Sequence, residues 1–161
     1  MNELPRRPKL DEYFLKLASV VAERSTCLRH HMGAIAVRDK HILSTGYNGA
    51  AAGLKDCLEL GCLRDELGIA SGTRHEICRA IHAEQNAIIQ AALHGVSLEG
   101  ATMYCTHTPC ILCAKMMVNA RIARSVSFGK YQDDQFIKLF EEAGIEVSIL
   151  ERPPEIITFL D

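Results

Sequence analysis

Three metal-binding side chains and one carboxylate occur in two short motifs of this chain. His82 and Glu84 form an H-x-E motif, and Cys110 and Cys113 belong to a P-C-x-x-C motif that begins at Pro109. One imidazole and two thiolates are three of the four ligands of a tetrahedral Zn²⁺ site, and a catalytic zinc leaves the fourth position to water. Zinc lowers the pKa of bound water from about 15.7 to about 7. Glu84 is then placed to carry protons between that water and a substrate.

Both motifs are predicted to lie where a helix begins. Pro109 suits the first helical position, where its missing N–H costs no hydrogen bond. Cys110 and Cys113 then share the first turn and one face of that helix, and the helix dipole there favours thiolate over thiol. His82 opens the helix of the other motif, so we expect two helix N-termini to meet at one metal ion.

Each motif also has a simpler interpretation on its own. The C-x-x-C pair is consistent with a redox pair of the thioredoxin type, and the H-A-E sequence with an ordinary helix start. The combination H-x-E…P-C-x-x-C, with each half at a strand-to-helix junction, is instead typical of zinc-dependent nucleobase deaminases. The two motifs together therefore predict a catalytic zinc site.

Length and composition indicate one globular domain. The chain has 161 residues, of which 48% are hydrophobic and 24% charged, enough to bury one core. A net charge of −2 argues against a non-specific polyanion binder. No apolar run reaches the roughly 18 residues of a membrane helix, and the first residues lack a signal-peptide core. Seven cysteines, two of them in the metal motif, fit a reducing compartment, so we expect a cytoplasmic protein.

The hydrophobic pattern predicts four helices and five strands in one α/β domain that spans residues 1–161. The helices are expected at residues 11–24, 82–93, 110–120 and 133–143, and the strands at residues 33–38, 41–45, 101–106, 124–128 and 146–150. This alternation predicts right-handed crossovers, a sheet covered on both faces, and a site beyond the strand carboxyl ends. Residues 1–10 are expected to form an irregular arm, and no element is assigned to residues 152–161. Residues 50–79 have weak periodicity, and so long a loop is usually functional or held by a specific interaction.

Four stretches of the chain resemble the deoxycytidylate (dCMP) deaminase family: RSTCLRHHMGAIAV, ILSTGYNGAAAG, CRAIHAEQNAI and GATMYCTHTPCILCAKMM. H-A-E-x-N-A-I with G-Y-N-G is more specific than the zinc motif, which the whole deaminase superfamily shares. The resemblance implies a three-layer α/β/α fold of the cytidine deaminase type, with a mixed central sheet of about five strands. It also implies zinc-dependent hydrolysis of dCMP to dUMP and ammonia, which supplies dTTP synthesis, and a homo-oligomer, in many members a hexamer.

The resemblance also implies roles for single residues. His82, Cys110 and Cys113 hold the zinc, and Glu84 shuttles protons from water to ring N3 and to the departing ammonia. Asn48 contacts the nucleotide sugar, although Asn-Gly at this position is equally typical of a type I′ hairpin turn. We expect 5′-phosphate contacts from Arg24 and Tyr131, since the arginine fork suits phosphate; a solvated arginine at a helix end is the alternative.

Two departures from the family and two other functions stay open. Ala51 stands where the family often has proline, and His31 where lysine is common, which leaves control by dCTP open. A tRNA adenosine deaminase shares both zinc motifs but needs a basic face and room for a flipped base. A basic run is missing from the C-terminal half, so we expect a mononucleotide and no nucleic acid. A non-catalytic zinc-stabilised module would fill the fourth zinc position with a protein ligand and would not need Glu84.

The remaining cysteines suggest a second, structural zinc. Cys105 alternates within an apolar strand, where a buried cysteine acts as a small hydrophobe. The other four are Cys27, which precedes residues 50–79, and Cys57, Cys62 and Cys78, which lie within them. A closed four-ligand zinc would hold this segment, because the free energy of metal binding becomes free energy of folding. Some dCMP deaminases carry such a zinc near these positions. His75 is an alternative ligand, and four separate reduced cysteines are the alternative to a metal site.

Overall fold

The computed structural model describes residues 7–130 and 134–151. Its main elements are the helices α1 (Leu10–Ala22), α4 (Ala83–Leu93), α5 (Ile111–Asn119) and α6 (Gln135–Ala143) and the strands β1 (Gly33–Arg38), β2 (His41–Tyr47), β5 (Thr102–Cys105), β6 (Arg124–Ser127) and β7 (Glu146–Ile149). These are the four helices and five strands expected from the sequence, each within a few residues of its predicted bounds. No helix among the described residues is long and apolar enough to cross a membrane.

The five strands form one mixed sheet in the order β2-β1-β5-β6-β7. Strand β1 is antiparallel to both β2 and β5, whereas β5, β6 and β7 are parallel to one another. Asp39 and Lys40 connect β1 to β2, and both have positive φ angles, 52° and 65°, as a type I′ hairpin requires. The predicted tight turn is therefore confirmed.

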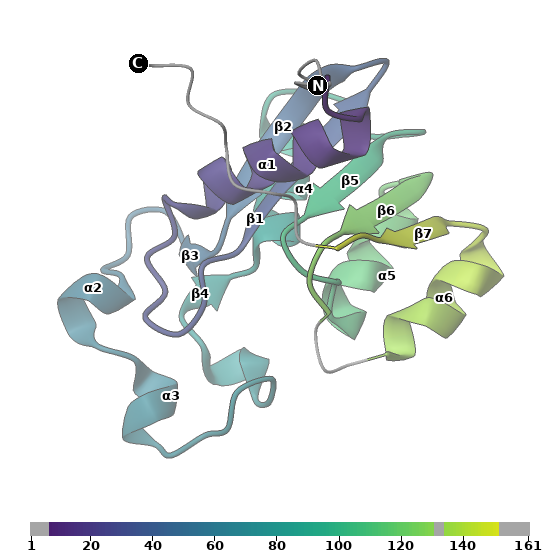
Figure 1. Ribbon diagram of the computed structural model, residues 1–161. Helices are drawn as coiled ribbons and strands as arrows, with labels where there is room; N and C mark the ends of the chain where they lie inside the picture. Colours follow the sequence, from purple (N-terminus) through teal and green to yellow (C-terminus); the bar gives the residue numbers. More distant parts are fainter. Residues whose placement is uncertain (1–6, 131–133, 152–161) are drawn as a thin grey trace, which may run out of the picture.

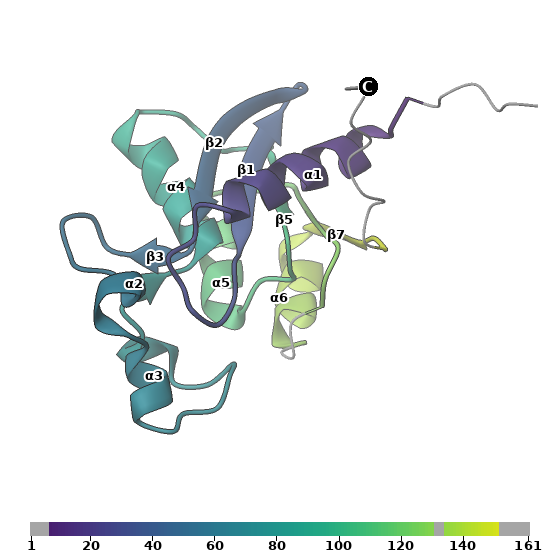
Figure 2. The same cartoon turned by 60° about the vertical axis from the view of Figure 1, so that its left-hand side comes forward.

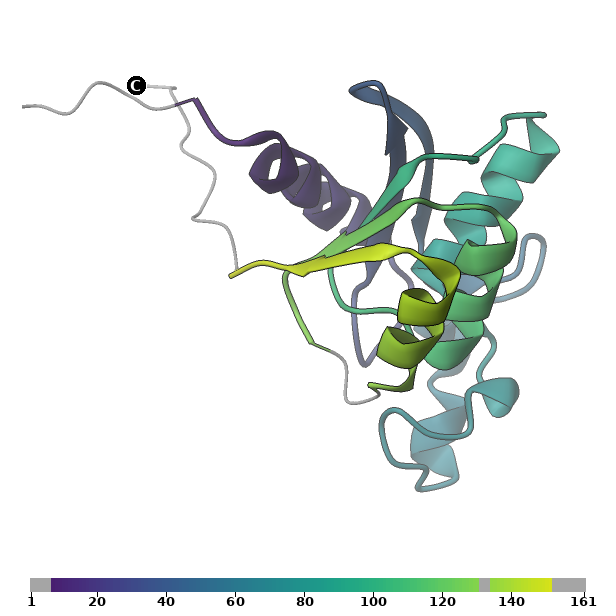
Figure 3. The ribbon, with the colours of Figure 1, turned by 90° about the vertical axis from the view of Figure 1, so that its right-hand side faces the viewer.

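Helices cover both faces of this sheet, so the domain has three layers (Figures 1 and 3). Helix α1 packs on one face, where Leu15 and Ala18 contact Ile35 of β1 in a buried cluster. Helices α4, α5 and α6 pack on the other face, where their buried side chains include Met117 and Phe136. The three-layer fold with a mixed five-stranded sheet is confirmed.

One local prediction was wrong, and one alternative does not hold. Helix α5 begins at Ile111 with Cys110 as its N-cap, so Pro109 lies one residue before the cap instead of at the first helical position. The G-Y-N-G stretch is not a hairpin turn, because neither Asn48 nor Gly49 has a positive φ angle. Instead β2 runs on to Tyr47, and the chain then enters a second, two-stranded sheet.

This second sheet joins the two ends of residues 50–79, the segment to which the sequence analysis assigned no element. Strand β3 (Gly49–Ala50) pairs antiparallel with β4 (Ala80–Ile81). Between them lie α2 (Cys57–Leu60), α3 (Leu63–Glu66) and a 3₁₀ turn at His75–Ile77. The segment extends from the three layers beside α4 (Figures 1 and 2), so the chain leaves the sheet after β2 and returns directly at α4.

Candidate active site

The three predicted metal ligands converge at two helix N-termini. His82 is the N-cap of α4 and Cys110 the N-cap of α5. The Nδ1 atom of His82 lies 3.5 Å from Sγ of Cys110 and 3.3 Å from Sγ of Cys113. Within residues 7–130 and 134–151, this is the only group of three or more histidine, cysteine or acidic side chains whose donor atoms all lie within 4.8 Å of one another.

The chemistry of this donor set fits zinc. A hydrogen bond with Cys113 lowers the pKa of Cys110 to about 3 despite partial burial, and the same hydrogen bond, with burial, raises the pKa of Cys113. Of the two thiols, Cys110 therefore loses its proton more readily than Cys113. The hydrogen bond with Cys110 also raises the pKa of His82. One nitrogen and two sulfur ligands leave one position of a tetrahedral zinc open, as in catalytic sites.

Glu84 lies beside this group without belonging to it. It is in the first turn of α4 and only 8% exposed. Burial raises the pKa of its carboxyl group, because a carboxylate is costly to keep away from water. A buried carboxyl group with a raised pKa next to a metal site is suited to accept and return protons near neutral pH.

Close packing and two hydrogen bonds fix the beginning of α4. A Cβ atom on Gly46 of β2 would lie 2.2 Å from the backbone oxygen of Ala83, so only glycine permits this approach. Asn86 donates a hydrogen bond from Nδ2 to the backbone oxygen of Tyr47 at 2.7 Å. The side chain of Gln85 accepts one from the backbone N–H of His82 at 2.9 Å. The G-Y-N-G stretch thus positions the helix that carries both His82 and Glu84.

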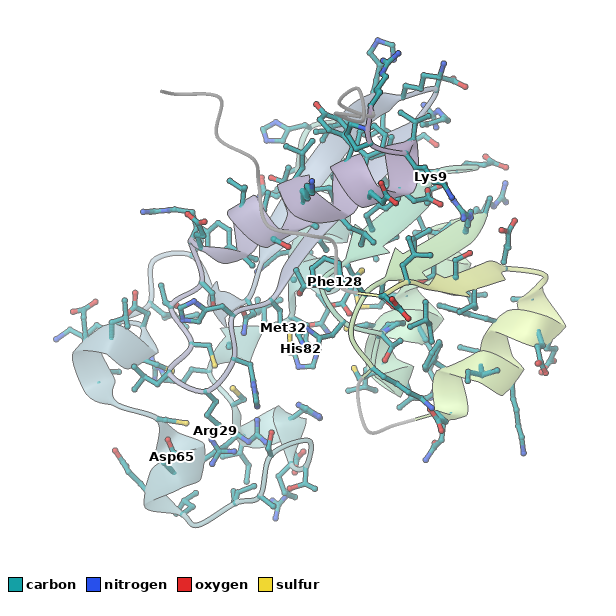
Figure 4. All side chains as sticks on the ribbon, in the orientation of Figure 1. Lys9, Arg29, Met32, Asp65, His82 and Phe128 are labelled. Atoms are coloured by element: carbon teal, nitrogen blue, oxygen red, sulfur yellow. The ribbon has the colours of Figure 1, made fainter. Side chains whose placement is uncertain are left out.

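An open cavity lies in front of these residues, at the carboxyl end of β5. Its lining includes His82 and Glu84, and also Asn48, Arg29 and Arg64. Figure 4 shows His82 between the layered body and the segment of α2 and α3. The predicted position of the site beyond the strand carboxyl ends is therefore confirmed.

Comparison with known proteins agrees with this geometry. The chain matches the cytidine and deoxycytidylate deaminase zinc-binding region over residues 8–129. The chain belongs to this family. It is 39% identical over 125 residues to the deoxycytidylate deaminase of Mycobacterium phage D29, which covers 74% of this chain and 94% of the phage protein. It is 36% identical over 151 residues to the deoxycytidylate deaminase of Saccharomyces cerevisiae, which covers 91% of this chain and 47% of the yeast protein, so the chain spans about half the length of that relative.

A solved structure supports the same assignment. The crystal structure of the dCMP deaminase from cyanophage S-TIM5 in complex with dCMP and dUMP superposes on this chain with a TM-score of 0.75 and 31% identity. The match covers 91% of this chain and 100% of the phage chain. The fold of this chain is therefore that of the cytidine deaminases.

Of the residues expected to bind substrate, Asn48 lines the cavity of the deaminase and is buried. Its Oδ1 atom accepts hydrogen bonds from Oγ of Ser25 at 2.5 Å and the backbone N–H of Met32 at 2.9 Å. Its Nδ2 atom donates to the backbone oxygen of His30 at 2.8 Å. Asn48 thus holds the loop before β1 in place. The second hydrogen of its side-chain amide is not used in these three hydrogen bonds.

Of the two residues expected at the 5′-phosphate, only Arg24 lies among the described residues, and it does not line the cavity. Arg24 is exposed just beyond the end of α1 and is not among the cavity-lining residues. Tyr131 lies outside the described residues. The structure instead places Arg29 and Arg64 at the cavity. No sequence pattern singles out these two arginines, because their position depends on how residues 50–79 fold.

The four cysteines proposed for a second zinc are near enough for their charges to interact, but no three of their Sγ atoms all lie within 4.8 Å of one another. Burial raises the pKa of the Cys57 thiol, and nearby thiolates at Cys78, Cys27 and Cys62 would raise it further. The ring centroid of His75 lies 4.9 Å from that of His82, and both rings line the cavity, as Cys27 and Cys78 also do.

Proposed function

We propose that this chain catalyses the zinc-dependent hydrolytic deamination of dCMP to dUMP and ammonia. The main support is the buried carboxyl group of Glu84 beside the His82, Cys110 and Cys113 group, within one open cavity. The S-TIM5 relative with the same fold binds dCMP and dUMP. His82, Cys110 and Cys113 would hold the zinc, which when bound supplies the Lewis acidity that makes water nucleophilic near neutral pH.

The protein side chains then move protons and orient the substrate. Glu84 takes a proton from the attacking water and delivers it to ring N3. The water oxygen bonds to C4, and Glu84 next carries the proton left on this new hydroxyl to the amino group. The bond between C4 and the amino nitrogen then breaks, so that water and dCMP become dUMP and ammonia. Asn48 is our candidate for the sugar contact, because it lines the cavity and has an amide N–H beyond its bonds to the loop.

The first prediction tests the proton shuttle. Glu84→Gln removes the proton carrier without removing a ligand, so we expect zinc content to stay constant while deamination of dCMP falls by about 10²–10⁴-fold. Ammonia release and elemental analysis measure the two quantities, and Glu66→Gln on the exposed face of α3 is the control. Near-normal turnover in Glu84→Gln, or zinc loss from a folded variant, would contradict the assignment.

The same assay separates the alternative functions. Ammonia release is compared for dCMP, deoxycytidine, dCTP and a tRNA anticodon hairpin. If adenosine in the hairpin is deaminated faster than dCMP, the protein would instead act as a tRNA adenosine deaminase. Bound zinc without ammonia release from any of these substrates would indicate a non-catalytic zinc-stabilised module.

We also propose a second, structural zinc held by Cys27, Cys57, Cys62 and Cys78. One support is that the four cysteines lie close enough for their charges to affect one another. The other is that helices α2 and α3 of this segment have only four residues each, so a metal ion would help to hold the segment in place. The packing of His75 against His82 makes this residue the weaker candidate ligand.

We further propose that the enzyme supplies dTTP synthesis as a cytoplasmic homo-oligomer, with a hexamer as the working assembly. The family resemblance supports the role in dTTP synthesis and the oligomer. The odd number of cysteines supports a reducing compartment such as the cytoplasm. Light scattering of the purified protein measures the assembly, and a monomer with full activity would contradict the oligomer.

A further inference from the structure

His107 places a partly exposed imidazole ring at the active-site cavity, just beyond the end of β5. Among residues 103–110 it is the only one that is not buried; its neighbours Thr106 and Thr108 are 4% and 3% exposed. The ring lines the same cavity as Glu84. The exposed part of this ring is thus available to a bound substrate, and none of the proposed proton transfers uses it.

The loops that follow β5 and β6 hold this ring in place. A Cβ atom on Gly129, two residues after β6, would lie 2.8 Å from Cδ2 and 3.1 Å from Nε2 of His107, so the ring packs where only a glycine fits. Nδ1 lies 3.4 Å from Oγ1 of Thr106. The backbone N–H of Thr108 donates to the backbone oxygen of Gly129 at 3.0 Å. The two loops are therefore joined next to the ring.

The strand end that carries the ring is also tied to β1. Oγ1 of Thr106 accepts a hydrogen bond from the backbone N–H of Gly33 at 3.2 Å and lies 3.7 Å from Sδ of Met32. The backbone N–H of Thr106 donates to the backbone oxygen of Gly33 at 3.0 Å. His107 is thus supported by three strands of the sheet, and groups held on such rigid elements keep a precise position.

The cavity offers few flat surfaces for a base. No phenylalanine or tyrosine among the described residues lines it, and its rings are the imidazoles of His30, His75, His82 and His107. His82 belongs to the metal group, and the ring of His75 packs edge-on against it. Nε2 of His30 lies 2.9 Å from Oγ of Ser71. His107 is the remaining ring, and enzymes that act on nucleobases hold the base between aromatic or apolar side chains.

We propose that the imidazole ring of His107 forms one wall of the base pocket, where it packs against the cytosine ring and holds C4 at the metal group. This proposal rests on the proposed deamination of dCMP and adds a positioning residue to the same cavity. Both ring nitrogens already lie against the protein, Nδ1 at Thr106 and Nε2 at Gly129. The role therefore depends on the flat ring, and not on a hydrogen bond or a proton from its nitrogens.

The test replaces the ring in the zinc-loaded enzyme and measures kcat/KM for dCMP. His107→Phe keeps a flat ring without the nitrogens, so its kcat/KM should stay within about fivefold of the wild-type value. His107→Ala removes the surface against which the base packs and should lose roughly 10- to 100-fold. His107→Asn keeps a polar side chain without a ring and should lose as much as His107→Ala.

His41→Ala is the matched control, because His41 is exposed, contacts the backbone oxygen of Asp39 and does not line the cavity. Its kcat/KM should stay within about twofold of the wild-type value. If His107 supplies a proton or an essential hydrogen bond, His107→Phe will be as impaired as His107→Ala. If it only packs the end of β5, zinc content and stability will fall without following the presence of a ring. Equal kcat/KM in the Ala, Asn and Phe variants, at any level, overturns the proposal.

Calorimetric binding of dCMP to Glu84→Gln separates binding from chemistry. Adding His107→Ala should weaken this binding by roughly tenfold or more, whereas adding His107→Phe should leave it within about fivefold. Where His107→Ala does not fold, the Asn and Phe variants carry both comparisons. A wild type that does not act on dCMP overturns the proposed function and the base wall together. An active wild type whose Ala and Asn variants match His107→Phe overturns the base wall alone.

Discussion

Asp11 of α1 and Arg124 of β6 form a bidentate ion pair that joins the outer helix to the sheet. The Nη1 and Nη2 atoms of Arg124 donate to Oδ1 and Oδ2 of Asp11 at 2.8 and 2.9 Å, and the hydroxyl of Tyr104 donates to Oδ1 at 2.8 Å. The hydrogen bond from Arg124 lowers the pKa of Asp11 and outweighs the opposing effect of partial burial. This residue pair thus stabilises the contact of α1 with β5 and β6 in a pH-dependent way.

Asp11→Asn should lower the free energy of unfolding by about 1–3 kcal/mol at pH 7, because Arg124 and Tyr104 lose a charged acceptor. A carboxyl group with a depressed pKa stabilises the fold above its unfolded pKa, and this contribution disappears as pH falls through the lower folded pKa. The difference between wild type and variant should therefore shrink below the ordinary Asp value of 3.8. Denaturant unfolding at several pH values measures it. The exposed pair of Arg121 and Glu99 provides the control Glu99→Gln, expected to cost under about 1 kcal/mol.

Single residues were predictable where sequence spacing alone fixes their geometry. His82 and Cys110 both lie at helix N-termini, as the motifs predict, because each motif is local to one strand-to-helix junction. Arg29 and Arg64 are 35 positions apart along the chain and meet only through the fold of residues 50–79. Each has one guanidinium nitrogen without a hydrogen-bond partner, Nη1 of Arg29 and Nε of Arg64, and no spacing in the sequence encodes this.

Among the elements, α4 is the one whose position decides the chemistry. Gly46 of β2 lets the first turn of this helix approach the sheet, since a Cβ atom there would meet the Ala83 oxygen at 2.2 Å and the Ala87 nitrogen at 2.4 Å. These are backbone atoms on either side of Glu84. Gly46→Ala must therefore shift the helix, and we expect it to cost about 1–3 kcal/mol of stability and at least about tenfold in kcat.

A second glycine separates displacement from simple destabilisation. Gly100→Ala places an alanine at a φ of +76° with nothing within 4 Å of the new Cβ atom, so it should cost about 1–2 kcal/mol through backbone strain alone. Its kcat should stay near the wild-type value. Equal kcat in Gly46→Ala and wild type, at comparable stability, would show that the close approach does not position Glu84.

The elements of the layered body were predictable because each has one apolar face or one buried run. Strand β1 is buried at its first five positions, and its bounds agree with the expected strand. The short helices α2 and α3 have four residues each, too few to show a helical period. The position of Pro109 before the N-cap was missed because a proline fits both positions without losing a hydrogen bond.

At the scale of the whole molecule, the active site lies between a well-packed body and the excursion of residues 50–79. Several leucines of this excursion are exposed: Leu54, Leu58, Leu60, Leu63 and Leu67. It therefore buries little apolar surface of its own, while it carries Arg64 and the loop that anchors Arg29. Whatever stabilises the excursion also holds one wall of the cavity, and segments with few buried contacts open at low free energy.

The proposed structural zinc predicts how this wall responds to loss of one ligand. Cys57→Ser should lower the zinc content from about two to about one ion per chain and destabilise the excursion, because metal binding contributes directly to folding. Trypsin should then cleave faster within residues 50–79, which contain the exposed basic residues Lys55, Arg74 and Arg79, while the layered body resists. Leu58→Ser, one residue away and 64% exposed in the parent, should change neither zinc content nor cleavage. A Cys57→Ser protein with parental zinc content and parental resistance to trypsin would show that the four cysteines hold no metal.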